Sequence, residues 1–174
     1  MPVTLLIGGA RSGKSRVALE RAKDSGRPVV FIATAERIAG DAEWEKRIAR
    51  HVADRPAEWT TIETPLDLPQ TVAALDGEVF AIVDCLTVWL SNLLHHGRDL
   101  DAESESLRTA LDASHAQIVL VSNELGLGLV PETEVGRTFR DAQGRLNQML
   151  AERAARVEFI AAGISLILKS KTGA

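Results

Sequence analysis

The segment GGARSGKS, at residues 8–15, has the residue types and the spacing that bind nucleotide phosphates. It matches the pattern G-x-x-x-x-G-K-[ST]. The glycines let backbone N–H groups surround phosphate oxygens, and the N-terminus of the following helix adds partial positive charge. A chance match in a glycine-rich turn is the alternative, but an apolar run precedes the segment and a helical pattern follows it. The residues expected to contact the phosphates are Gly8, Gly9, Ala10, Arg11, Ser12, Gly13, Lys14 and Ser15.

Two side chains of this segment and one carboxylate have the chemistry of a catalytic phosphate site. Lys14 is expected to reach the β- and γ-phosphates as a catalytic residue, and Ser15 is expected to bind Mg²⁺. Asp84 ends the apolar run AIVD, and a carboxylate at the carboxyl edge of a parallel sheet faces the ligand crevice. We expect it to bind Mg²⁺ or a water on that ion. The alternative is that Asp84 caps the helix starting in CLTVWLSNLL.

A basic stretch, KRIARHVADRP at residues 46–56, contains a histidine. Its positive neighbours lower the pKa of His51 and favour the neutral imidazole, which is a nucleophile. At helical spacing Arg47, His51 and Arg55 share one face, so two arginines would hold phosphate on either side of the imidazole. Such a histidine could attack an α-phosphorus and release pyrophosphate. The residues alone favour the other reading, a solvated helix with mixed charges.

Short apolar runs alternate with amphipathic stretches along the whole chain, which predicts an α/β fold. Continuous apolar runs suit strands buried on both faces of a parallel sheet, so we expect one doubly wound, mostly parallel domain over residues 1–174. Gly163 favours a turn inside the last run and hence a C-terminal β-hairpin at the sheet edge. Strands are expected at 3–9, 28–35, 78–86, 117–125 and 157–169. Helices are expected at 14–25, 36–54, 66–75, 86–96, 102–114 and 134–155.

Composition limits the classes of function. The chain has 174 residues, 45% hydrophobic and 25% charged, as in globular enzymes. A net charge of −4 gives no overall basic field, so we expect no nucleic-acid partner. A single cysteine, Cys85, and no apolar run of transmembrane length favour a cytoplasmic protein without a transmembrane segment.

Taken in order, these segments resemble the bifunctional adenosylcobinamide kinase and adenosylcobinamide-phosphate guanylyltransferase family of cobalamin biosynthesis. The phosphate-binding loop GGARSGKS, called the P-loop, is shared with many enzymes, whereas R-I-x-x-H-x-x-x-R-P and S-N-E-x-G-x-G-x-V-P-E are far more specific. The segments that carry the resemblance are GGARSGKS, IATA (32–35), RIARHVADRPAEW (47–59), TIE (61–63), VDCLTVWLSNLL (83–94), VSNELGLGLVPE (121–132) and GRTFRDAQGRLNQMLA (136–151).

The resemblance implies a two-step enzyme and reverses the reading of His51. ATP or GTP would phosphorylate adenosylcobinamide with Mg²⁺, and GTP would then guanylylate His51, whose GMP passes to the new phosphate. A homotrimer is also implied, with the helix at 134–155 as a candidate contact and a solvated helix as its equal alternative. The further GTP contacts that the resemblance implies are Ala33, Thr34, Ala35, Val52, Ala53, Asp54, Arg55, Glu63, Asp84 and Cys85, with Glu63 expected to bind the guanine edge.

Two other functions remain open from the residues. A plain P-loop small-molecule kinase would phosphorylate a substrate without taking up the α-phosphate. A nucleotide-dependent switch or binding module would hydrolyse nucleotide slowly under the control of a partner. Against the switch, VSNELGLG stands where switch GTPases carry N-K-x-D, and no switch loops are recognisable.

Overall fold

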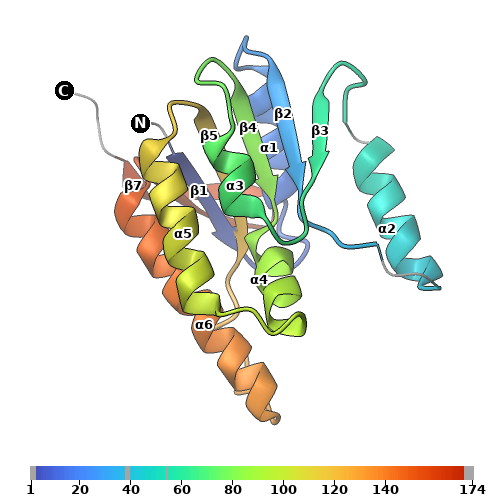
Figure 1. The fold of residues 1–174 in the computed structure, drawn as a ribbon, viewed down its shortest axis with the longest axis vertical. Helices are drawn as coiled ribbons and strands as arrows, with labels where there is room; N and C mark the ends of the chain where they lie inside the picture. The colour runs from blue at the N-terminus through green and yellow to red at the C-terminus, as the bar shows by residue number, and fades with distance from the viewer. Residues whose placement is uncertain (1–2, 38–39, 54, 171–174) are drawn as a thin grey trace.

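The computed structural model describes residues 3–37, 40–53 and 55–170; within this part, the side chains of Arg47, Arg50 and His51 are left out. A seven-stranded sheet with strand order β3-β2-β4-β5-β1-β6-β7 forms the centre of the fold (Figure 1). Only the pair β6–β7 is antiparallel. The strands are β1 (Val3–Gly8), β2 (Val29–Ala33), β3 (Thr60–Glu63), β4 (Phe80–Asp84), β5 (Gln117–Asn123), β6 (Arg156–Ala161) and β7 (Ile164–Ser170).

Helices cover both faces of the sheet, as the sequence predicts for a doubly wound α/β fold. One apolar cluster packs α1 against one face of the sheet, at positions such as Leu6, and the other packs α3 to α6 against the opposite face, at positions such as Leu5. Trp89 is fully buried in the second cluster, and its Nε1 donates to the Leu66 carbonyl at 2.8 Å. The helices are α1 (Lys14–Lys23), α2 (Ala42–Ala53), α3 (Leu68–Ala73), α4 (Leu86–His95), α5 (Leu100–Ala113) and α6 (Glu134–Arg153).

Capping side chains explain where two helices begin. The expected helix 36–54 begins only at Ala42, because Asp41 accepts a hydrogen bond from the Trp44 N–H at 2.9 Å and so caps α2. The expected helix 102–114 begins earlier, at Leu100, because Asp99 caps α5. The other expected helices exist with boundaries shifted by one or two residues.

Two features at the sheet edges bear on the sequence predictions. Strand β3 was not expected, because its residues TTIE are mostly exposed and lack a buried apolar run. The C-terminal hairpin is confirmed: β6 and β7 pair antiparallel around Ala162 and Gly163, both with left-handed backbone. Glu158, fully buried in β6, is held by Arg21 at 2.5 Å and by Arg156 and Ser165.

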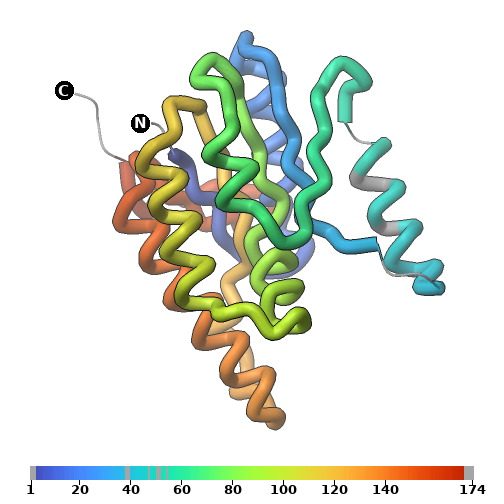
Figure 2. Tube along the Cα trace, viewed as in Figure 1, coloured from blue at the N-terminus to red at the C-terminus, as the bar shows by residue number. Residues whose placement is uncertain are grey.

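Helix α2 stands apart from the two layers that cover the sheet, as the trace in Figure 2 shows. It is joined to β2 and β3 by the segments on either side of it. Among the described residues, none of the helices combines the length and the apolar composition that crossing a bilayer requires.

Candidate active site

The carboxyl ends of six neighbouring parallel strands, β3 to β6 in the sheet order, lie at one edge of the sheet, which is the lower edge in Figure 1. The strand register places Gly8 beside Asn123, and Ala33 between Glu63 and Asp84. In open parallel sheets ligands bind outside these carboxyl ends. The structure therefore brings the P-loop and the predicted strand-end residues to one crevice.

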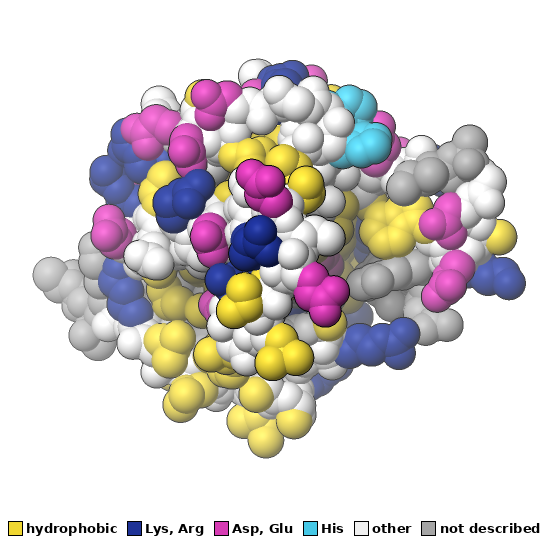
Figure 3. All heavy atoms as spheres, turned by 90° about the horizontal axis from the view of Figure 1, so that it is seen from below, with side chains coloured by type: hydrophobic (Ala, Val, Ile, Leu, Met, Phe, Trp, Pro, Cys, Tyr) yellow, Lys and Arg dark blue, Asp and Glu magenta, His cyan; other side chains and the backbone are white. Residues whose placement is uncertain are grey.

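Seen from below, this edge carries interspersed acidic and basic side chains rather than one basic patch (Figure 3). The mixture agrees with the net charge of −4. Any affinity for phosphate must therefore come from a few positioned groups and not from a general positive surface.

The P-loop holds its lysine inside the loop. Lys14 is 6% exposed, and its Nζ donates to the carbonyls of Gly8 at 3.0 Å and Gly9 at 2.7 Å. Burial lowers the pKa of Lys14, while the nearby Cys85 and Asp84 partly oppose this shift. The ammonium group is therefore kept at the centre of the loop, where nucleotide phosphates bind in this class of loop.

The N-terminus of α1 is arranged to receive an anion. Gly13 occupies the N-cap position with left-handed φ of 102° and provides no side-chain cap. The first N–H groups of a helix lack partners within the helix, and the helix dipole favours negative charge there. Ser15, predicted to bind Mg²⁺, lies in this first turn and is partly exposed.

The turn of the C-terminal hairpin abuts the P-loop, a contact that the sequence did not predict. The Gly163 N–H donates to the Ser12 carbonyl at 2.8 Å, and the Arg16 guanidinium donates to the Gly163 carbonyl at 3.1 Å. A Cβ at Gly13 would lie 3.0 Å from the Gly163 Cα. The hairpin thus fixes the loop from outside.

Thr34 fixes the backbone that follows Asp84. The buried Thr34 hydroxyl accepts from the Cys85 N–H at 2.9 Å and donates to the Cys85 carbonyl at 2.8 Å. Cys85 occupies the N-cap position of α4, so the alternative that Asp84 is the N-cap is wrong. Burial and then the Asp84 carboxylate raise the pKa of Cys85 to about 11, so this thiol stays protonated at neutral pH.

Two arginines lie close to the carboxylates at the ends of β3 and β4, which are Glu63 and Asp84. The Arg55 guanidinium lies 3.6 Å from the centre of the Phe31 ring, a cation–π contact. Burial lowers the pKa of Arg55, while Asp84 and Glu63 partly oppose this shift. The hydrogen bond from Arg37, at 2.9 Å, lowers the pKa of Glu63 and keeps it ionised.

The predicted face of Arg47, His51 and Arg55 is corrected in part. Helix α2 ends at Ala53, so Arg55 lies beyond it and does not continue a helical face. The backbone of His51 belongs to α2, but its side chain lies outside the described residues, as does the whole of Asp54. Val52 and Ala53 are exposed in the last turn.

Side chains of two helices hold the end of β5. The Thr87 hydroxyl accepts from the Asn123 N–H at 2.8 Å, and the Asn147 amide donates to the Asn123 carbonyl at 3.0 Å. The next residue, Glu124, donates its N–H to the Gly8 carbonyl at 3.0 Å. No local pattern in the sequence indicates these supports.

The residues fit a magnesium ion that is bound together with nucleotide. In the described ranges no three His, Cys, Asp or Glu side chains form a ready metal cluster. Mg²⁺ commonly uses one or two protein oxygens together with substrate phosphates and water. Ser15 and Asp84 provide that limited set beside the P-loop.

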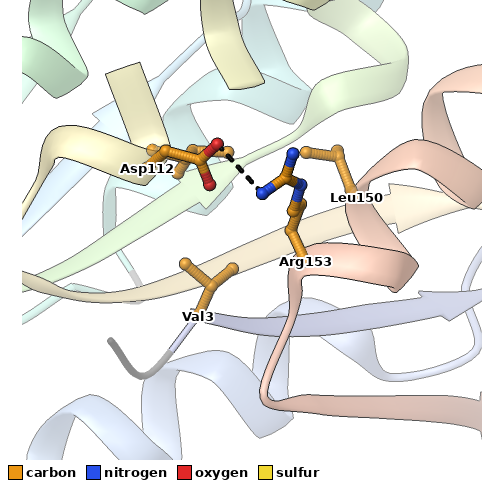
Figure 4. A pocket seen from close by; sticks show the side chains of 5 residues that line it. Val3, Asp112, Leu150 and Arg153 are labelled. Atoms are coloured by element: carbon orange, nitrogen blue, oxygen red, sulfur yellow. Dashed lines mark ion pairs between the residues drawn. The ribbon is translucent and has the colours of Figure 1, made fainter. Parts of the chain in front are cut away.

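A small cavity of about 70 Å³ lies far from this crevice, near the amino end of β1 (Figure 4). Its lining includes Val3 and Leu150, and an ion pair of 3.3 Å joins Asp112 to Arg153 beside it. It contains no group that the site chemistry needs, and we assign it no role.

A P-loop at the end of β1, with a carboxylate two strands away at the end of β4, defines a P-loop nucleotide-binding protein. The structure is similar to an ATPase of the type III secretion system of pathogenic bacteria, with a TM-score of 0.57 and 11% identity. That match covers 98% of this chain and 57% of the ATPase, and it shows the fold alone.

Residues 4–168 match the family of cobinamide kinase / cobinamide phosphate guanyltransferase, and the chain belongs to that enzyme family. It is 48% identical over 170 residues to the bifunctional adenosylcobalamin biosynthesis protein CobP of Pseudomonas aeruginosa, covering 96% of this chain and 97% of that protein. It is 38% identical over 181 residues to CobU of Escherichia coli, which has the same bifunctional description, covering 95% and 98%. The family expected from the sequence is thus confirmed.

Proposed function

We propose that this chain phosphorylates adenosylcobinamide with ATP or GTP and then transfers GMP from GTP to the new phosphate. The products are adenosylcobinamide-GDP and pyrophosphate, in the assembly of the cobalamin nucleotide loop. The observation that carries the proposal is the family match over residues 4–168, which includes a P-loop and Asp84 in one crevice.

In the kinase step the P-loop binds the triphosphate. Backbone N–H groups at the start of α1 contact phosphate oxygens, and the Lys14 ammonium moves from its loop carbonyls to the β- and γ-phosphates. Ser15 and Asp84 would hold Mg²⁺, which when bound neutralises phosphate charge. This arrangement positions the γ-phosphorus for attack by the hydroxyl of the acceptor.

In the guanylyl step His51 is the nucleophile. An imidazole nitrogen bonds to the α-phosphorus of GTP, the bond from that phosphorus to the bridging oxygen breaks, and pyrophosphate leaves. A phosphate oxygen of the acceptor then attacks the same phosphorus, and the phosphorus–nitrogen bond breaks. Arg55, packed on Phe31 beside Asp84, would bind phosphate, and Glu63 would accept the N–H groups of guanine.

The proposal requires α2 to approach the P-loop when GTP binds. The helix stands clear of the layered body, so it can change position without disturbing the core (Figure 2). GTP should therefore protect residues 36–56 from proteolysis. Equal cleavage with and without GTP would argue against the movement.

We propose a cytoplasmic homo-oligomer, a trimer by family resemblance. The apolar side chains of Ile164, Leu166, Ile167 and Leu168 are largely exposed along β7, which supports a subunit contact. Light scattering measures the mass directly: three chains of 18.8 kDa support the trimer, and a single chain would refute it.

The activity is tested with purified protein, GTP, Mg²⁺ and adenosylcobinamide. Mass spectrometry should detect adenosylcobinamide phosphate first and adenosylcobinamide-GDP later. Formation of adenosylcobinamide phosphate alone, even at excess GTP, would indicate a plain kinase. Nucleotide hydrolysis without either corrinoid product would indicate a nucleotide-dependent switch.

A further inference from the structure

A groove of about 700 Å³ opens between α6 and the carboxyl ends of β1 and β5. Ile7, which lines it, directly precedes the first P-loop glycine, and Glu124 donates its N–H to that glycine's carbonyl at 3.0 Å. The groove therefore lies against the P-loop, on the face of the sheet opposite α1. The lining residues that matter here are Ile7, Glu124, Arg140, Gly144, Arg145 and Gln148.

We propose that this groove is the acceptor site, which binds the hydroxyl-bearing arm of the corrinoid and then the phosphate monoester made from it. This inference rests on the proposed function and deepens it. A single site for both acceptors must provide a proton acceptor for the alcohol and cationic donors for the phosphate. The groove has both kinds of group, next to the P-loop.

The two arginines have weak partners of their own. Arg140 lies 3.5 Å from Asp141, and its side chain is 23% exposed; Arg145 lies 3.4 Å from Asp101 at an exposed position. In both pairs the carboxylate partner is exposed to solvent, and ion pairs with an exposed partner add little to stability. A phosphate monoester, which suits the planar donors of arginine, can therefore replace these carboxylates.

Glu124 is oriented at the end of the groove nearest the P-loop. One carboxylate oxygen accepts from the Gly126 N–H at 2.6 Å, which fixes the side chain. The hydroxyl oxygen of the acceptor bonds to the γ-phosphorus, and Glu124 accepts the proton that this hydroxyl loses. The bond from that phosphorus to the β–γ bridging oxygen breaks, and the nucleoside diphosphate leaves.

Gly144 keeps the middle of the groove open. It lies one turn from Arg140 and one turn from Gln148, and a Cβ built on it would meet no atom within 4 Å. Glycine inside a helix weakens that helix relative to alanine, so packing does not favour it here. A side chain at position 144 would narrow the groove between the arginines and Gln148, which explains a glycine at this position.

The variant Gly144→Leu tests the site by filling it without disturbing the protein. We expect an equal or higher melting temperature, and KM values for adenosylcobinamide and its phosphate that rise about tenfold or more. Labelling of the enzyme by GTP alone should not change. The matched control, Glu152→Leu, adds the same side chain to α6 at an exposed position outside the groove and should leave both KM values unchanged.

Charge variants separate the two acceptors. Arg140→Gln and Arg145→Gln should each raise the KM for adenosylcobinamide phosphate roughly tenfold, and raise it for the alcohol less. Glu124→Gln should lower kcat of the kinase step and leave labelling by GTP intact.

Unchanged acceptor KM values in Gly144→Leu, with normal wild-type turnover, would overturn the groove assignment alone. A changed oligomeric state with unchanged KM would assign the groove to a second copy of the chain and also overturn it. Wild-type protein that turns over neither corrinoid would overturn the proposed function itself.

Discussion

The contact between the P-loop and the C-terminal hairpin predicts a specific defect in Gly13→Ala. Alanine at a φ of 102° carries backbone strain of about 1–2 kcal/mol. Its Cβ would also lie 3.0 Å from the Gly163 Cα, so the loop or the hairpin must shift. That shift weakens the 2.8 Å bond between Gly163 and Ser12, for about 1 kcal/mol more.

Gly26→Ala is the matched control, because Gly26 also has positive φ, at 66°, but its Cβ would meet no atom within 4 Å. Urea unfolding should show a loss of about 1–2 kcal/mol in the control and roughly 2–3 kcal/mol in Gly13→Ala. Calorimetry with GTP should show a Kd raised about tenfold or more in Gly13→Ala only, since displaced N–H groups lose bonds to phosphate. Wild-type GTP affinity in Gly13→Ala would refute the reasoning.

Three further variants test other parts of the structure. Burial opposes ionisation of Glu158, but hydrogen bonds from two arginines and a serine outweigh it and keep the pKa of this carboxyl below its ordinary 4.5. Glu158→Gln should therefore lose about 3 kcal/mol in urea unfolding at neutral pH, with a difference that shrinks as the pH falls below 4.5; a pH-independent difference would contradict this. Trp89→Phe should lower stability by about 1–2 kcal/mol in thermal unfolding, because the Leu66 carbonyl loses its donor, and an unchanged melting temperature would count against that bond. Thr34→Val frees the Cys85 backbone and should lower kcat of the kinase step about tenfold with little change in nucleotide Kd; the reverse pattern would place Thr34 in nucleotide binding.

Local patterns in the sequence are sufficient to predict the P-loop and the strand and helix on either side of it. A buried strand, a glycine-rich turn and an amphipathic helix follow one another at residues 3–23, and each is specified by its own residues. The C-terminal hairpin was predicted for the same reason, because Gly163 supplies the turn.

Features that depend on contacts between residues far apart in the chain cannot be predicted from local sequence patterns. The contact of Gly163 with Ser12 joins residues far apart in the chain, so no spacing indicates it. Strand β3 exists because it pairs with β2 at a sheet edge, although its own residues are mostly exposed. The spacing predicts Arg55 on the same helix as His51, but α2 ends at Ala53 and the Arg55 guanidinium lies over the Phe31 ring.

The central claim is that His51 carries GMP between GTP and the corrinoid. The most direct measurement is labelling of the purified protein with GTP that is radioactive at the α-phosphate, in wild type and in His51→Ala. The account predicts a covalent label that is acid-labile, stable to base and absent from the variant, as for a phosphoramidate on histidine. A label of equal strength in His51→Ala, or no label on wild-type protein that binds GTP, would contradict it.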